Sequence, residues 1–207
     1  MTPIAEAGLT LTVDLGALAR NWTRLARVAA PAECAAVVKA DAYGLGVEHA
    51  VPALWAAGCR TFFVALPAEG RRARAAAPAA AIYVLGGFFA EAADTYAAAD
   101  LRPVLNSAGD LSAWAKLGAG RPAALHVDTG MNRLGFSLPD ALALAGSAEI
   151  GGAKIALLIS HGGKLRALQI TVSKLTARSN FSSMRSTKRA TASLSMARTS
   201  RASSKVL

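Results

Sequence analysis

The chain has 207 residues, of which 53% are hydrophobic, and a formal net charge of +10. This length and apolar content are enough for one large domain or two small ones with a buried core. Polar residues, glycine or proline interrupt every apolar run well before the roughly 20 residues that a membrane-spanning helix needs, and the N-terminus has no secretory-signal pattern. We therefore expect a cytoplasmic protein without membrane segments, whose two cysteines are buried free thiols.

The excess positive charge is confined to one end of the sequence. Residues 1–161 contain 13 Lys and Arg and 13 Asp and Glu, whereas residues 162–207 contain 10 Lys and Arg and no acidic residue. A basic surface indicates nucleic-acid binding only where the charge is localised, so the first part of the chain gives no such indication. Nucleic-acid binding through the tail is an alternative that we do not favour, and salt-dependent binding would be its hallmark.

Short apolar segments alternate with helical segments along residues 9–161. A first strand is expected at 9–15, followed by a helix that begins at Asp14 or Gly16 and ends before Pro31. After this helix, six strands are expected at 35–39, 60–66, 81–85, 101–105, 123–128 and 153–159. The helices between them are expected at 47–57, 68–77, 89–99, 107–117 and 139–148.

This alternation indicates right-handed βαβ units around a parallel sheet. An open doubly wound sheet and a (β/α)₈ barrel both fit the spacing. No G-x-G-x-x-G opens a helix after a strand, which favours the barrel. The expected fold class is therefore α/β, with an incomplete (β/α)₈ TIM-like barrel of about six units over residues 1–161.

The sequence after His161 differs in composition. Residues 162–207 contain 15 Ser and Thr, no acidic residue and no proline. Such a segment cannot bury enough apolar surface to offset its chain entropy, so this basic tail is predicted to be disordered. A native basic arm is one explanation, and translation out of frame is the other. We favour the second, because the βα rhythm stops before the units that would close a barrel.

Three segments point to a particular chemistry. AAVVKADAYGLG at 35–46 places Lys39 where a buried strand meets a glycine-containing turn, a position that suits a reactive amine. Two further segments follow in order, HVDTGMNRLGF at 126–136 and LLISH at 157–161. Together, the three segments resemble motifs of the alanine racemase family, whose members are fold-type III pyridoxal-phosphate enzymes. The resemblance covers about residues 9–161, the front part of a family member. It implies a barrel that in the family precedes a β-rich C-terminal domain, for which this sequence has no match.

The resemblance implies pyridoxal 5'-phosphate as cofactor, no metal, and roles for four residues. Lys39 would condense with the cofactor aldehyde and then move the α-proton of alanine on the face of the D-enantiomer. Tyr43 matches the tyrosine that binds the cofactor phosphate, and His161 matches the histidine packed by the cofactor ring. Arg133 matches the arginine near the cofactor's phenolic oxygen and the substrate carboxylate. An arginine suits this role because its fork of donors can bind an anion.

Parts of the family pattern are changed or missing. His126 stands where some relatives have a modified lysine. The family's second base is a tyrosine of the C-terminal domain, contributed across a homodimer interface, whereas Tyr43, Tyr83 and Tyr96 all precede the tail. We therefore expect an alanine racemase lineage that supplies D-alanine for cell-wall precursors, with this chain a truncated, inactive product. Substrate breadth between alanine and serine stays open, and the nearest alternative is a single-domain pyridoxal-phosphate homeostasis protein without racemase activity.

Overall fold

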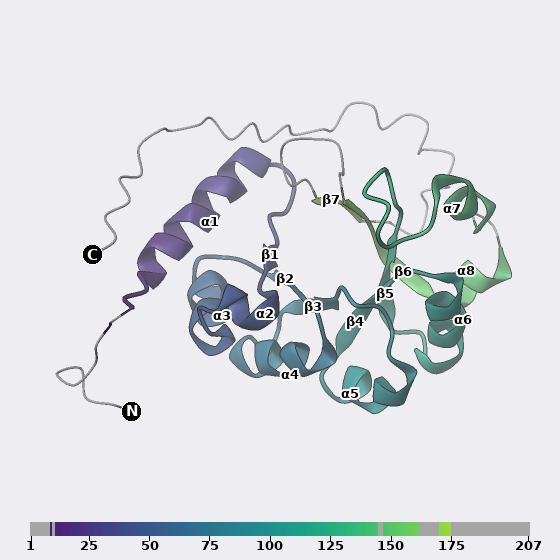
Figure 1. The fold of residues 1–207 in the computed structure, drawn as a ribbon, viewed down its shortest axis with the longest axis horizontal. Coiled ribbons are helices and arrows are strands. Elements are labelled where there is room, and N and C mark those ends of the chain that lie inside the picture. The colour runs from purple at the N-terminus through teal and green to yellow at the C-terminus, as the bar shows by residue number, and fades with distance from the viewer. Residues whose placement is uncertain (1–8, 10, 145–146, 162–169, 175–207) are drawn as a thin grey trace.

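The computed structural model describes residues 9, 11–144, 147–161 and 170–174, and its centre is a curved sheet with helices along its outer face (Figure 1). The strands are β1 (Ala36–Val37), β2 (Thr61–Val64), β3 (Ala81–Val84), β4 (Leu101–Leu105), β5 (Pro122–His126), β6 (Lys154–His161) and β7 (Ile170–Lys174). The helices are α1 (Leu15–Ala29), α2 (Lys39–Tyr43), α3 (Val47–Ala56), α4 (Pro67–Ala76), η2 (Ala90–Ala92), α5 (Ala93–Ala98), α6 (Ala108–Leu117), α7 (Leu138–Leu144) and α8 (Ala148–Gly152).

Strand order identifies the kind of sheet. Each strand pairs with the next one along the chain, in the order β1 to β7, and β1 to β6 are all parallel. A doubly wound sheet reverses its strand order at a switch point, and this sheet contains no reversal. The six parallel strands curl into part of a barrel, with α3, α4, α5 and α6 on the convex side (Figure 1). The expected incomplete barrel is confirmed.

Alternating side chains of the strands form two separate apolar clusters, because successive residues of a strand point to opposite faces. The larger cluster lies between the sheet and the helices and includes Phe62, Ile82, Leu125 and Trp114. The smaller cluster lies on the concave face and consists of Phe63, Tyr83, Val104, Ala124, Leu157 and Ile159. The rings of Phe63 and Tyr83 stack with their centroids 5.3 Å apart. Both faces of the curved sheet are therefore apolar along most of its length.

The six strands expected after the first helix are all present. Of the two residues expected to begin that helix, Asp14 and Gly16, the structure selects Asp14, whose Oδ1 accepts a hydrogen bond from Ala17 N. The strand expected at 9–15 is wrong. Residues 11–14 form no strand, and the Leu9 and Leu11 side chains are 86% and 82% exposed. A strand needs a partner for its backbone groups, and the part of the chain described here offers none to this segment.

The helix expected at 139–148 is observed as two short helices, α7 and α8. Of the tail predicted to be disordered, the structure describes only β7, which was not expected and pairs antiparallel with β6. The rest of residues 162–207 lies outside the described residues. Both cysteines are free thiols, with Cys59 buried and Cys34 half-buried. No helix in the described ranges is long and apolar enough to cross a bilayer.

Candidate functional site

Four polar side chains follow the inner apolar cluster at the carboxyl ends of the strands. Each of them lies two residues beyond a strand residue that faces the inner cluster. They are Lys39 after β1, Asn106 after β4, His126 at the end of β5 and His161 at the end of β6. Since successive residues alternate between the two faces, these positions continue the inner rows. Parallel strands end at the same rim, and in barrels of this kind the active site lies at that rim. The carboxyl rim is therefore the candidate site.

Lys39 begins an unusual left-handed turn that directly follows β1. Although the segment is labelled α2, Ala40, Asp41 and Ala42 have φ of 51°, 54° and 53°, and Tyr43 has φ of 55°. Left-handed backbone is unfavourable for residues with a Cβ, so four in a row require support from their surroundings. Gly44, with φ of 86°, closes the turn and donates its N–H to Ala40 O at 3.0 Å. The turn places the Tyr43 side chain at the surface, 62% exposed.

Glu69 of α4 supplies one part of this support. Its Oε1 accepts a hydrogen bond from Ala40 N at 2.7 Å, immediately after Lys39. Its Oε2 accepts from Ala65 N at 2.7 Å and from Leu66 N at 3.3 Å, at the end of β2. One carboxylate thus joins the segments that follow two neighbouring strands, and it fixes the backbone beside Lys39.

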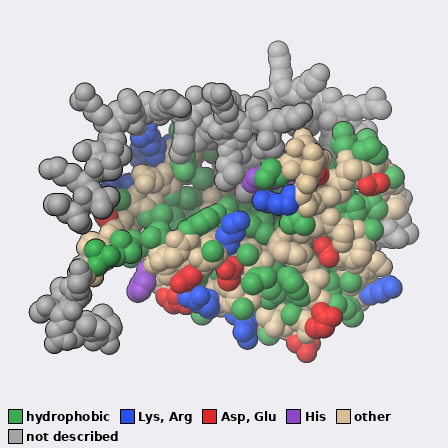
Figure 2. All heavy atoms as spheres, in the orientation of Figure 1, with side chains coloured by type: hydrophobic (Ala, Val, Ile, Leu, Met, Phe, Trp, Pro, Cys, Tyr) green, Lys and Arg blue, Asp and Glu red, His purple; other side chains and the backbone are tan. Residues whose placement is uncertain are grey.

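A charged network on the outer surface supports the other side of the turn. Arg72 donates to Asp41 Oδ1 at 2.7 Å and to both carboxylate oxygens of Glu48, each at 2.6 Å. These bonds lower the pKa of Glu48 to about 2. Asp41 Oδ1 also accepts from Val47 N at 3.0 Å, at the start of α3. Acidic and basic side chains accordingly lie beside one another over α3 and α4 (Figure 2).

On the opposite side of the rim, a closed loop carries Arg133. Phe136 N donates to His126 O and Asp128 N donates to Phe136 O, both at 2.8 Å, so the two ends of the loop are paired. The Asp128 carboxylate accepts from the backbone N–H groups of Gly130, Met131 and Asn132, which lowers its pKa. Arg133 projects from this loop and is exposed.

His126 is the buried polar side chain of this region. It is 8% exposed, and its Nδ1 lies 2.7 Å from Asn106 Oδ1. Burial lowers the pKa of His126, the charges of His161 and Arg133 lower it further, and Asp128 acts in the opposite direction. His126 pairs with Ile159 of β6, two residues before His161, and the loop that carries Arg133 is paired at its ends beside His126, whereas Lys39 and Tyr43 lie at the β1 end of the rim. A bond of 2.5 Å between Thr129 Oγ1 and Ser160 Oγ joins the loop to β6.

The donors of the rim suit an anionic ligand. Three carboxylates lie close to it, and each is already engaged by backbone N–H groups, as described for Glu69, Asp41 and Asp128. The remaining groups are the Lys39 amine, the Tyr43 hydroxyl, the Arg133 guanidinium and the His161 imidazole, which can all donate hydrogen bonds. A phosphorylated aldehyde would find there an amine to bond with and donors for its phosphate. Within the described ranges no cluster of His, Cys, Asp or Glu is arranged to hold a metal ion.

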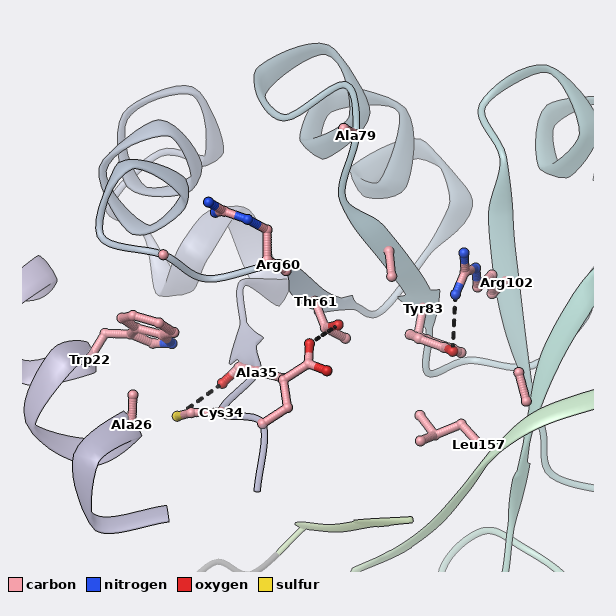
Figure 3. A pocket seen from close by; sticks show the side chains of 14 residues that line it. Trp22, Ala26, Cys34, Ala35, Arg60, Thr61, Ala79, Tyr83, Arg102 and Leu157 are labelled. Atoms are coloured by element: carbon pink, nitrogen blue, oxygen red, sulfur yellow. Dashed lines mark hydrogen bonds between the residues drawn. The ribbon is translucent and has the colours of Figure 1, made fainter. Parts of the chain in front are cut away.

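A separate hollow of about 810 Å³ lies at the opposite, amino-terminal rim (Figure 3). Its lining includes Trp22, Arg60, Thr61, Tyr83 and Arg102, which come from α1 and from residues at or near the starts of β2, β3 and β4. None of the four residues predicted for the site lines it. The hollow is therefore distinct from the candidate site.

Asn106 and Glu69 were not recognised in the sequence as site residues. Asn106 directly follows an expected strand, a position that in a barrel indicates an active-site residue. The same position is also compatible with the start of the helix that follows. Glu69 lies three residues into α4 and accepts from the N–H of the N-cap residue Leu66, a pattern typical of many helix starts. Its link to the residue after Lys39 spans 29 positions, so only the folded chain reveals it.

Known proteins resemble this chain over most of its length. A model of the family "Alanine racemase, N-terminal domain" matches residues 13–207. Alanine racemase of Methylobacterium nodulans is 55% identical over 165 residues, which are 78% of this chain and 45% of that protein. The biosynthetic alanine racemase of Agrobacterium fabrum is 52% identical over 143 residues, 68% of this chain and 37% of that protein.

Solved structures give the same result. Alanine racemase from Bartonella henselae, with covalently bound pyridoxal phosphate, superposes with a TM-score of 0.68 at 38% identity, over 73% of this chain and 46% of that one. The biosynthetic enzyme of Pseudomonas aeruginosa gives a TM-score of 0.65 at 33% identity, over 72% of this chain and 43% of that one. The chain thus spans less than half the length of these relatives. It belongs to the alanine racemase family and corresponds to its N-terminal domain.

Proposed function

We propose that this chain derives from an alanine racemase that depends on pyridoxal 5'-phosphate. In this proposal the chain supplies the lysine that bonds to the cofactor. The observation that carries the proposal is the position of Lys39, at the carboxyl end of β1 in a turn held by Glu69 and Asp41. The rim around it offers hydrogen-bond donors to an anion, while the nearby carboxylates are already engaged. The Bartonella relative holds this cofactor covalently.

Each residue of the rim has a distinct part in this proposal. The Tyr43 hydroxyl would donate to the cofactor phosphate, and the His161 imidazole would pack against the cofactor ring. The Arg133 guanidinium binds the carboxylate of alanine. When bound, the cofactor withdraws electrons from the α-carbon, so that the α-proton can be removed. The Lys39 Nζ removes or returns this proton on one face of the substrate.

Racemisation also needs a residue that moves the proton on the other face. The sequence has three tyrosines. Tyr83 is buried in the concave cluster, and Tyr96 is buried with its hydroxyl donating to Gly87 O at 2.6 Å. Tyr43 follows Lys39 on the same turn. By resemblance, the second base is a tyrosine of a C-terminal domain in the other copy of a homodimer, so we propose that this chain binds the cofactor but does not racemise alanine by itself.

The experiment is to add pyridoxal 5'-phosphate to the purified full chain, reduce with borohydride and map the modified lysine by mass spectrometry. We expect the label on Lys39 and its loss in Lys39→Ala, with the matched control Lys116→Ala, at an exposed position on α6, unchanged. A label elsewhere would refute the lysine assignment. Chiral chromatography after incubation with L-alanine should detect no D-alanine, and turnover would refute the proposal of an inactive chain.

The alternative functions and the other proposals each have a separate test. A single-domain homeostasis protein would also be labelled on Lys39, but the relatives described above are all named alanine racemase. Nucleic-acid binding through residues 162–207 would be lost on deletion of that tail. An out-of-frame origin of the tail and a cytoplasmic location remain proposals. Sequencing the locus in all frames tests the first, and fractionation of cells expressing a tagged chain tests the second.

A further inference from the structure

The hollow at the amino-terminal rim is lined by two side chains whose buried nitrogens have no hydrogen-bond partner. Among the described residues, three buried side-chain nitrogens lack a partner, namely Trp22 Nε1, Arg102 Nε and Arg121 Nη1. Trp22 and Arg102 both line this hollow, and they lie on opposite sides of it (Figure 3). Buried donors are nearly always satisfied in folded proteins, so two unpaired donors around one hollow point to a ligand or to water between them.

Arg102 lies beside Tyr83 on the concave face of the sheet. It comes two residues before Val104 of the inner cluster, and it pairs in register with Tyr83 on the neighbouring strand. Its Nη1 lies 3.4 Å from the Tyr83 hydroxyl, and its guanidinium carbon lies 5.6 Å from the centre of the Tyr83 ring (Figure 3). Tyr83 therefore holds one side of the guanidinium in place.

The other edge of this guanidinium is free to bind an anion. Neither Nε nor Nη2 of Arg102 has a hydrogen-bond partner among the described residues. These two nitrogens carry parallel N–H donors, whose spacing matches the two oxygens of a carboxylate. The one carboxylate in the described lining belongs to Glu33, whose Oε1 accepts from Thr61 Oγ1 at 2.6 Å, at the start of β2.

The wall between Arg102 and Trp22 is largely apolar. The indole of Trp22 packs through its six-membered ring, because a Cβ on Gly58 would lie 3.5 Å from its Cζ3 and Cη2. Nε1 belongs to the five-membered ring, on the other side of the indole (Figure 3). Leu157 and Tyr83 add larger apolar surfaces from the inner cluster. Most of the remaining lining consists of small side chains, at Ala26, Ala35, Ala79, Ala81 and Ala156.

We infer that this hollow is a second ligand site, which binds a small organic carboxylate with a flat apolar body. The carboxylate accepts two parallel hydrogen bonds from Nε and Nη2 of Arg102. The apolar body lies against Tyr83, Leu157 and the alanines, where its contact removes apolar surface from water. The inference goes beyond the proposed function, because this hollow lies at the rim opposite Lys39.

Calorimetric titration of the full chain with two compounds of the same shape tests the inference. The first is 2-naphthoate, and the second is the uncharged 2-naphthamide. We expect naphthoate to bind at least about tenfold more tightly, because a bidentate hydrogen bond between two charged groups is lost in the amide. Equal affinities would show that no cation recognises the carboxylate. Absence of naphthoate binding would show that water alone satisfies Arg102, and either result overturns the inference.

Variants then locate the bound carboxylate. Arg102→Met keeps a long apolar stem but removes every donor, so the affinity for naphthoate should fall about tenfold, to that for naphthamide. The matched control is Arg71→Met, at an exposed position on α4, which should leave the affinity unchanged. Loss of binding in Arg133→Met, with Arg102→Met unaffected, would place the ligand at the opposite rim and overturn the inference.

Two features keep these outcomes separate from folding and from the proposed function. Circular dichroism checks that Arg102→Met is folded, and the comparison of the two compounds on the wild-type chain decides the matter without any variant. No measurement uses pyridoxal 5'-phosphate, so failure of the Lys39 labelling would refute the proposed function without affecting this result.

Discussion

Replacement of Glu69 by alanine tests whether one carboxylate stabilises the turn that carries Lys39. Glu69 accepts from Ala40 N and Ala65 N at 2.7 Å and from Leu66 N at 3.3 Å. The variant removes the acceptor for all three N–H groups. Residues Ala40 to Tyr43 have φ between 51° and 55°, which costs about 1–2 kcal/mol per residue relative to ordinary helical backbone. The turn should therefore depend on hydrogen bonds from outside it.

The expected loss follows from the two short bonds. Hydrogen bonds to a charged group contribute about 1.5–3 kcal/mol each. Because Glu69 is only half-buried, the lower end applies, and Glu69→Ala should reduce the free energy of unfolding by about 3 kcal/mol. Glu69→Gln keeps one acceptor oxygen but turns an NH₂ group towards a backbone donor. The free energy of unfolding should therefore fall less in Glu69→Gln than in Glu69→Ala, but by a measurable amount.

Urea unfolding of the full chain, followed by circular dichroism, measures these differences. Glu69→Ala should lower the midpoint without changing the slope m, since the surface exposed on unfolding stays the same. The matched control is Glu91→Ala, an exposed glutamate on η2, which should stay within about 0.5 kcal/mol of wild type. If Glu69→Ala were as stable as this control, the hydrogen bonds assigned to Glu69 would not stabilise the turn.

Three further predictions concern the core and the rim. Burial lowers the pKa of His126 from its ordinary value of 6.5, so the unfolded chain binds more protons and the free energy of unfolding should fall as the pH drops from about 7 through 6.5 and below. Urea titrations between pH 5 and 8 measure this slope, and a His126→Phe variant with an equally steep slope would refute its assignment to this ring. Gly135→Ala should lower the melting temperature by several degrees, because φ is +102° and the new Cβ would press on His126. The control Gly120→Ala should lower the melting temperature less, because its Cβ would meet no atom within 4 Å. Tyr96→Phe should cost about 1–3 kcal/mol in urea unfolding, since it leaves the buried Gly87 O without its donor, and a smaller cost than that of Thr95→Ala would contradict this.

Local patterns in the sequence were sufficient for most of the fold. The six strands after the first helix were predicted because apolar runs of strand length alternate with helices, and Asp14 was one of the two residues predicted to begin that helix. The position of Lys39 at a strand end was also readable, because the change from apolar strand to glycine turn is encoded within a few residues. These features depend on interactions between near neighbours in the chain.

Features that depend on a distant partner were decided only by the tertiary structure. Residues 9–15 have the alternation of a strand, but residues 11–14 form none, since a strand requires another backbone to pair with. Spacing also could not separate a barrel from a doubly wound sheet, because the two differ in which strands pair. Likewise, Asn106 and His126 lie 20 residues apart and meet only because β4 and β5 are adjacent and end at one rim. The sequence by itself determined most of the elements and the position of Lys39 at the end of a strand, and long-range pairing determined which side chains lie around this position.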